Sequence, residues 1–251
     1  MNIAGIQKLT LLDFPGRLAA TIFTPGCNLR CPFCHNASLV DPAELKVTLE
    51  ETGLLDQQEV LDFLRERFGR LTGLAVTGGE PLMQTGILDF LKQVKDIGYA
   101  IKLDTNGTNP ERLRALLSAG IVDYVAMDLK NCRKKYAVTT GLPESSTPIL
   151  YENTLLSARF IRESGVEHEF RTTVVAQLHT VDDIRAIAKD FAGAPAYFLQ
   201  SFADSGDILG SGCDYNSLPD DQKFTAAPRE TMEAMQKAAQ EFIPNTQLRG
   251  I

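Results

Sequence analysis

The sequence has no long hydrophobic run, no basic leader and no excess of positive charge. No stretch approaches the roughly 18 uncharged apolar residues that a membrane-spanning helix requires, so we expect no membrane partner. Residues 1–5 lack the basic segment and the following apolar run of a signal peptide. The formal net charge of −7 makes nucleic acid a poor partner, because an acidic chain releases no counterions from a polyanion. We therefore expect a cytoplasmic protein.

Repeats and low-complexity tracts are also absent, and the composition is that of an ordinary globular protein. The chain has 251 residues, of which 44% are hydrophobic and 23% charged, enough for a sizeable core. We expect one domain over residues 1–251. Apolar residues at helical spacing alternate with short buried runs from residue 56 onward. The predicted strands are 19–23, 73–77, 99–103, 122–127, 167–175 and 196–199, and the predicted helices are 57–68, 87–97, 110–120, 151–164, 179–191 and 228–242.

This alternation with short connections predicts right-handed βαβ units and a parallel sheet. About six strands are too few for a closed eight-stranded barrel, so we expect an α/β fold in the form of a partial, open (β/α)6 TIM-like barrel. In such folds the chemistry lies at the carboxyl ends of the strands. Polar segments follow five of the predicted strands, at 24–34, 78–81, 104–107, 128–130 and 200–201. These segments, far apart in the sequence, are expected to meet at the carboxyl end of the barrel.

Three of the five cysteines, Cys27, Cys31 and Cys34, lie together in a loop at 24–36. Their C-x3-C-x2-C spacing supplies soft thiolate ligands, which select iron–sulfur clusters, zinc or Cu(I). A cubane held wholly by protein needs four cysteines, but Cys132 and Cys213 are isolated in the sequence and are expected to be structural thiols. Three thiolates leave one iron without a protein ligand, which is what a catalytic metal centre needs.

A zinc site or a redox thiol remains the alternative for this loop. The zinc site would use His35 as a fourth ligand, although His35 directly follows Cys34 and structural zinc sites usually pair two short knuckles. A zinc- or cluster-bearing interaction module is the corresponding non-enzymatic alternative. Metal analysis would distinguish these possibilities.

The cysteine loop also carries a family resemblance. Its spacing, with the aromatic Phe33 before the last cysteine, resembles the signature of the radical S-adenosylmethionine (SAM) superfamily. The longer match comprises Leu-Leu-Asp-Phe-Pro-Gly at 11–16, Pro-Gly-Cys-Asn-Leu-Arg-Cys at 25–31 and Cys-His-Asn at 34–36. It resembles the activases of glycyl radical enzymes, and among them the anaerobic ribonucleoside-triphosphate reductase activating proteins. The resemblance covers nearly the whole chain and is densest over residues 5–130.

This resemblance implies a barrel of the radical SAM type, with one [4Fe–4S] cluster on the three clustered cysteines and SAM at the open iron. It implies that reductive cleavage of SAM yields a 5′-deoxyadenosyl radical, which abstracts hydrogen from a glycine of a partner enzyme. The implied partner is anaerobic ribonucleotide reductase, with flavodoxin or ferredoxin as electron donor. Activation of pyruvate formate-lyase or another glycyl radical enzyme, or small-molecule chemistry such as that of 7-carboxy-7-deazaguanine synthase, remains an alternative. No general acid or base is required, because the cofactor carries the chemistry.

Two of the polar segments predict contacts to this ligand. Gly78 and Gly79 allow a close backbone approach, and Glu80 can accept hydrogen bonds from a substrate ammonium. The alternative for these residues is a plain strand-to-helix turn. Asp104 and Asn106 belong to the segment 104–107, which could be an Asx-type turn. The resemblance instead places Asp104 near the ribose and methionyl part of SAM.

Further candidates come from the later strands. Asp128 and Lys130 could form a surface ion pair, whereas the resemblance assigns Lys130 to the ligand carboxylate. Alternation along 170–174 places Arg171 in the lumen or in a salt bridge of the barrel, and we place Gln200 near the adenine or carboxylate. The expected cofactor-binding set is Phe33, Gly78, Gly79, Glu80, Asp104, Asn106, Asp128, Lys130, Arg171 and Gln200.

The resemblance implies two further sites. A monovalent cation would be held by Asp104, Thr105, Met127 and Asp128. Asp13 matches the position at which activases meet their target peptide, with a simple turn residue as the alternative. The polar connections 141–148 and 204–219 are candidates for partner contact or for closing over the site, with plain surface loops as the alternative.

Overall fold

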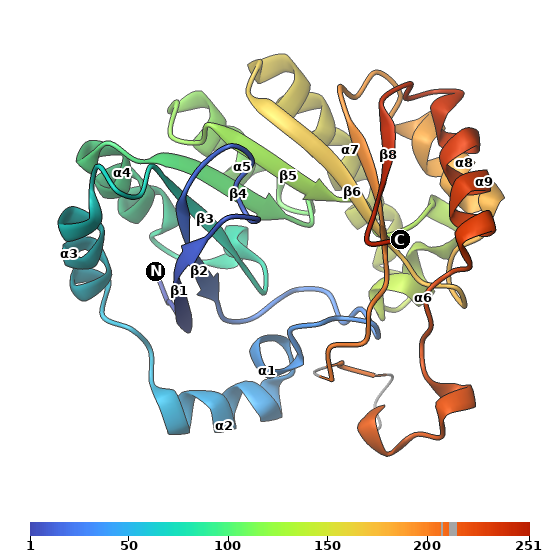
Figure 1. The fold of residues 1–251 in the computed structure, drawn as a ribbon, viewed down its shortest axis with the longest axis horizontal. Helices are drawn as coiled ribbons and strands as arrows, with labels where there is room; N and C mark the ends of the chain where they lie inside the picture. The colour runs from blue at the N-terminus through green and yellow to red at the C-terminus, as the bar shows by residue number, and fades with distance from the viewer. Residues whose placement is uncertain (207, 211–214) are drawn as a thin grey trace.

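The fold is built on one curved eight-stranded sheet with the strand order β1 to β8 (Figure 1). A computed structural model describes residues 1–206, 208–210 and 215–251. Strand β1 pairs antiparallel with β2, and all later neighbours pair in parallel. The strands are β1 Gly5–Thr10, β2 Ala19–Thr24, β3 Gly73–Gly78, β4 Ala100–Thr105, β5 Tyr124–Asp128, β6 Glu167–Val174, β7 Tyr197–Ser201 and β8 Thr246–Arg249.

Helices flank this sheet, most of them on its outer face, as Figure 1 shows. They are α1 Ala37–Val40, α2 Pro42–Thr52, α3 Gln57–Arg67, α4 Ile87–Ile97, α5 Pro110–Ser118, α6 Tyr136–Thr140, α7 Thr147–Ser164, α8 Val181–Asp190 and α9 Arg229–Gln240. The strands β2 to β7 are followed in turn by α3, α4, α5, α7, α8 and α9. The expected partial barrel of six β/α units is therefore confirmed. No helix in the described part of the chain is long and apolar enough to cross a membrane.

The sequence did not predict the two edge strands or three of the helices. Strands β1 and β8 extend the six expected strands to eight. Helix α2 has no buried residue and thus no apolar stripe, while α1 and α6 are too short to show a period. Helix α7 begins at Thr147 rather than 151, so the expected loop at 141–148 is shorter than predicted. Asn109 caps α5, with its side chain accepting from the Arg112 N–H.

The two faces of the sheet differ sharply in chemistry. Apolar side chains such as Val125, Phe170 and Leu199 pack outward against the helices in one large core. Because side chains alternate along a strand, the intervening residues face the lumen. Two of these, Lys102 and Glu169, are charged and buried. No pairing joins β8 to β1 among the residues described, so the lumen is open along one side.

Candidate active site

The three clustered cysteines line one cavity at the carboxyl end of the barrel. Cys31 is buried, and Cys27 and Cys34 are half-buried. All three contribute to the wall of a cavity of about 160 Å³, together with residues that follow β3, β4 and β5. Within the described ranges, no trio of Cys, His, Asp or Glu is placed around a single ion. Three thiols that face one shared space are a donor set that can hold an iron–sulfur cluster.

Burial controls the protonation of these thiols. It raises the pKa of Cys27 to about 11, with a further contribution from the Glu80 carboxylate, and the pKa of Cys31 to about 12. Both thiols are therefore protonated at neutral pH when no metal is bound. Because iron binds thiolates, cluster assembly must release these protons.

Helix α6 supports the cysteine loop from outside the cavity. The Arg30 N–H donates to the Thr140 carbonyl over 2.8 Å at the end of α6. The next residue, Gly141, has φ +66°, and a Cβ there would lie only 2.0 Å from the Arg30 carbonyl oxygen. The Arg30 guanidinium also donates to the Cys27 carbonyl over 2.6 Å. The sequence analysis missed this support because it joins residues far apart in the chain.

Gly78 and Gly79, at the end of β3, pack closely against the backbone of the cysteine loop. A Cβ on Gly79 would lie 2.0 Å from the Gly26 carbonyl oxygen, and one on Gly78 would lie 2.4 Å from the Thr24 nitrogen. The Glu80 N–H donates to the Gly26 carbonyl over 2.8 Å. Both glycines also line the cavity, as expected for a close approach to a ligand. The tightest contact that they permit is nevertheless with the protein backbone.

Glu80 holds two loops together inside the protein. It is 1% exposed, and its carboxylate accepts from the Leu82 N–H, the Thr105 hydroxyl and the Asn106 N–H over 3.0, 2.8 and 2.7 Å. Burial raises its pKa to about 7, although these donors act in the opposite direction. Asn106 continues the connection, because its side-chain amide donates to Asn28 in the cysteine loop over 3.0 Å. The predicted acceptor for a substrate ammonium thus already carries three protein donors.

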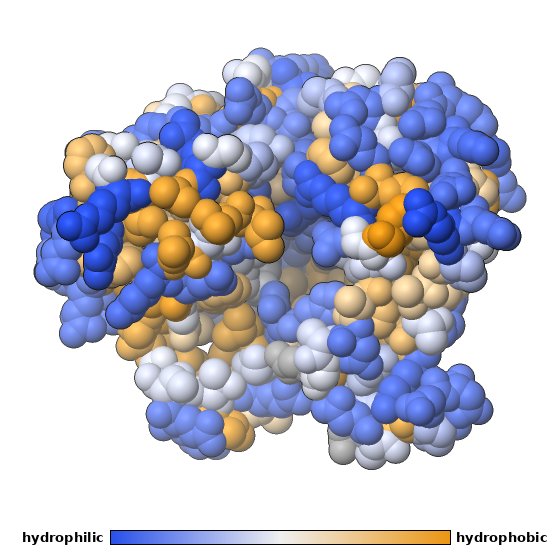
Figure 2. All heavy atoms as spheres, in the orientation of Figure 1, coloured by the Kyte–Doolittle hydropathy of each residue, from blue (hydrophilic) through white to orange (hydrophobic). Residues whose placement is uncertain are grey.

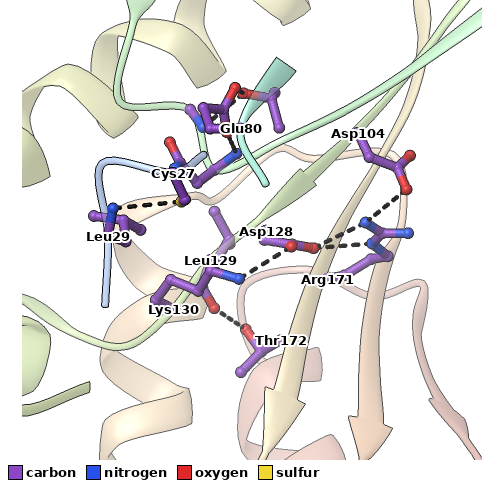
Figure 3. Close-up of polar contacts among 12 residues, drawn as sticks. Cys27, Leu29, Glu80, Asp104, Asp128, Leu129, Lys130, Arg171 and Thr172 are labelled. Carbon is purple, nitrogen blue, oxygen red and sulfur yellow. Dashed lines mark hydrogen bonds and ion pairs between the residues drawn. The ribbon is translucent and has the colours of Figure 1, made fainter. Parts of the chain in front are cut away.

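Asp104 and Asp128 are joined by Arg171, which lies between them in Figure 3. Arg171 lies 3.4 Å from Asp104 and 3.0 Å from Asp128. Lys130 lies 3.1 Å from the other oxygen of Asp128, and Lys102 pairs with Asp104. Burial alone would raise the pKa of Asp128, but Lys130 and Arg171 hold it at about 2. Arg171 is thus salt-bridged within the barrel, and Asp128 and Lys130 form an ion pair that lies in the cavity wall rather than on the surface.

Of the remaining predicted residues, some line the cavity and others do not. Phe33 is buried and lines the cavity. Met127 is fully buried in the core outside the sheet, so its side chain does not reach the lumen. Gln200 is exposed on β7 and is not part of the cavity wall. The Cys132 thiol contacts Asp183 at 3.5 Å, as a structural thiol would, while Cys213 and part of 204–219 fall outside the described residues.

Two site residues had no role in the sequence analysis. Lys102 is buried in the lumen against Asp104. His179 is buried behind the site, and its Nε2 lies 2.9 Å from the Lys130 carbonyl oxygen. Burial lowers the pKa of His179, so the imidazole is neutral at pH 7. A charged residue two positions before Asp104 was the available signal for Lys102, because alternation puts both on one face.

A family model described as the radical SAM superfamily matches residues 21–191. The chain belongs to this superfamily. A candidate glycyl-radical enzyme activating enzyme of Methanocaldococcus jannaschii is 29% identical over 252 residues, which cover 99% of this chain and 96% of that protein. The pyruvate formate-lyase-activating enzyme of Clostridium pasteurianum is 35% identical over 133 residues, or 52% of each chain.

Structural comparison agrees with this assignment at the level of the fold. The crystal structure of Streptococcus suis SuiB bound to S-adenosylmethionine superposes with a TM-score of 0.63 over 92% of this chain and 52% of SuiB, at 12% identity. The matched region thus spans about half the length of SuiB, and the match to the clostridial enzyme covers about half of either chain. Radical SAM enzymes use a [4Fe–4S] cluster and SAM, and the thiol-lined cavity fits them. When bound, the reduced cluster supplies the electron that cleaves SAM to a 5′-deoxyadenosyl radical.

Proposed function

We propose that this radical SAM enzyme activates a glycyl radical enzyme, with anaerobic ribonucleotide reductase as its target. The match to the methanogen protein over 99% of the chain carries the activase proposal. The sequence motif at 11–16, together with the Cys-His-Asn at 34–36, supports the choice of target. Flavodoxin or ferredoxin is the electron donor that we propose.

Cys27, Cys31 and Cys34 are the proposed cluster ligands, because they are the thiols that line the cavity. Lys130 is the proposed partner of the SAM carboxylate. It lines the same cavity, and with Lys102 and Arg171 it gives the site three positive side chains against the two aspartates. The role of these residues is to bind and orient SAM and to keep water from the reacting carbon.

The open side of the barrel is the proposed entrance for the target glycine. It lies between the edge strands β1 and β8, where Figure 2 shows a hollow beside an apolar patch. Leu9, Leu11 and Leu12 are 56%, 68% and 90% exposed on the β1 side of this face. Asp13 follows them directly and is half-buried. An apolar rim with one carboxylate beside an open lumen suits an extended peptide.

The activase proposal is tested by mixing experiments under anaerobic conditions. The reconstituted enzyme is combined with reductant, SAM and either purified anaerobic ribonucleotide reductase or pyruvate formate-lyase, and glycyl radicals are read by EPR. We expect a glycyl radical on the reductase. A radical only on the lyase would change the target, and SAM cleavage without a radical on any partner would contradict the activase function. A zinc protein without iron would contradict the cluster assignment as well.

A further inference from the structure

The four carboxylate oxygens of Asp104 and Asp128 all have a cationic side chain as partner. Lys102 Nζ contacts Asp104 Oδ1, and Arg171 Nη2 lies 3.4 Å from Asp104 Oδ2. Arg171 lies 3.0 Å from Asp128 Oδ1, and Lys130 Nζ lies 3.1 Å from Asp128 Oδ2. These contacts form a continuous chain of alternating charges across β4, β5 and β6, part of which is drawn in Figure 3. Neither aspartate presents an oxygen without a positive neighbour.

The charge balance of this group is already positive. Three cationic and two anionic side chains leave one surplus positive charge. The Lys102 and Asp104 side chains are only 3% and 16% exposed, so solvent screens them weakly. Among these five side chains a further cation finds no unbalanced negative charge, whereas an anionic ligand group is attracted to the surplus positive charge.

A monovalent cation held by Asp104, Thr105, Met127 and Asp128 does not fit this arrangement. Its two carboxylate ligands are engaged by Lys102, Arg171 and Lys130. The Thr105 hydroxyl donates to Glu80 over 2.8 Å and accepts from the Gly107 N–H over 3.1 Å. The Met127 side chain lies in the core outside the sheet, so Met127 could offer an ion only its backbone carbonyl oxygen. Cationic side chains of the protein therefore already engage the carboxylate oxygens that an ion would need.

We propose that Lys102 and Arg171 are the built-in counterions of Asp104 and Asp128, so that SAM binding requires no monovalent cation. Lys102 is a positioning residue in this scheme. It holds the Asp104 carboxylate in the lumen and neutralises it, which leaves the surplus charge on Lys130 for the carboxylate of SAM. The proposal rests on membership of the radical SAM superfamily and on SAM binding at this cavity, and it is independent of the target enzyme.

The first test measures SAM affinity of the reconstituted enzyme in potassium, sodium and tetramethylammonium chloride at equal ionic strength, without any partner. Tetramethylammonium is too large to replace a bound metal ion, so it serves as the cation-free reference. We expect dissociation constants that agree within about twofold across the three salts. Binding that is weaker by about tenfold or more in tetramethylammonium would overturn the proposal.

The second test removes the internal charge. Lys102→Met keeps the length of the side chain but leaves Asp104 Oδ1 without its cation. We expect SAM affinity to fall by about tenfold in tetramethylammonium and to be restored by potassium or sodium, because an ion can then bind in place of the ammonium group. Lys102→Arg should behave as the wild type in all three salts. Lys92→Met, at an exposed position of α4, is the matched control.

An equal loss of affinity in all three salts would show that Lys102 has only a structural role, and unchanged affinity would show that it has none. Either result overturns the assignment of Lys102. If Lys102→Met does not fold, the proposal is still tested by the SAM affinity of the wild type and of Lys102→Arg in the three salts. None of these measurements involves a glycyl radical, so the proposed activase function can fail while this inference stands.

Discussion

The backbone N–H of Asn106 donates to Glu80 Oε2 over 2.7 Å, and this bond ties the loop after β4 to the loop after β3. The other oxygen of Glu80 accepts from Thr105 Oγ1 and from the Leu82 N–H. Because Glu80 also donates its own N–H to Gly26, the same residue reaches the cysteine loop. One buried residue, through its carboxylate and its backbone N–H, thus ties together three strand ends that surround the cavity.

Thr105→Val tests how much the hydrogen bonds of the Glu80 carboxylate contribute to stability. The change keeps the shape of the side chain but removes one donor to Glu80 and the acceptor of the Gly107 N–H. Leaving buried polar groups without partners costs about 1–3 kcal/mol, so we expect the free energy of unfolding to fall by about 2 kcal/mol. Chemical denaturation of the metal-free protein measures this. Thr72→Val, on an exposed threonine, should change it by less than about 0.5 kcal/mol, and equal effects would contradict the role of Glu80.

Gly141→Ala tests the support of the cysteine loop by α6. The new Cβ would lie 2.0 Å from the Arg30 carbonyl oxygen, so either α6 or the cysteine loop must move. Gly165→Ala is the matched control, because Gly165 also ends a helix with positive φ but has nothing within 4 Å of its added Cβ. Both variants lose about 1–2 kcal/mol from backbone strain.

We expect only Gly141→Ala to bind clearly less iron after reconstitution. The measurement is iron per chain together with the absorbance of the cluster, and thermal unfolding reports the shared strain. Iron content that is equal in the two variants would show that the contact between α6 and the cysteine loop does not position the cysteines.

The buried carboxylate of Glu169 should make the free energy of unfolding depend on pH. Arg249 donates to both of its oxygens, over 3.0 and 2.9 Å, and Tyr124 adds a third bond over 2.9 Å. Burial would raise the pKa of Glu169, but the contacts to Arg249 lower it below the ordinary value of 4.5. The folded state therefore favours the ionised form. The stabilisation is fully present above the ordinary pKa and is lost as pH falls below it through the folded pKa.

Glu169→Gln should accordingly lower the free energy of unfolding by about 2 kcal/mol at pH 7, and the difference from wild type should shrink below pH 4.5. Glu163→Gln is the control, because Glu163 pairs with Arg159 on the surface of α7, where solvent screens the pair and it contributes little to stability. Denaturant unfolding at a series of pH values tests both. A loss for Glu169→Gln that stays constant down to pH 3 would contradict the linkage.

The sequence predicted the site well where a motif and a strand end coincide. The cysteines, the glycines at 78 and 79 and the acidic residues at the ends of β4 and β5 meet at one cavity, as the parallel register requires. The edge strand β8 has only four residues, and α6 has five, so neither produces a periodic pattern. Both elements were missed for that reason.

The role of Lys102 could not be predicted from the sequence for a different reason. Alternation places it on the face of Asp104, but whether that face is the lumen or the helix side depends on the assembled barrel. The sequence pattern also does not reveal that Arg171 reaches both aspartates from β6, since that contact depends on strand stagger and side-chain length. Motifs thus identified the ligand class, and only the structure showed how the charges are balanced.

Asp13→Asn tests the proposed entrance for the target peptide. Asp13 Oδ2 accepts from Thr21 Oγ1 over 2.6 Å, which fixes the carboxylate beside the exposed Leu12. The substitution keeps the size of the side chain and removes its negative charge. If Asp13 contacts the target, fewer glycyl radicals should form for each SAM cleaved, by about tenfold, because one charge-assisted contact is lost. Asp96→Asn, at an exposed position of α4, should leave this ratio unchanged, and an unchanged ratio in Asp13→Asn would remove Asp13 from the interface.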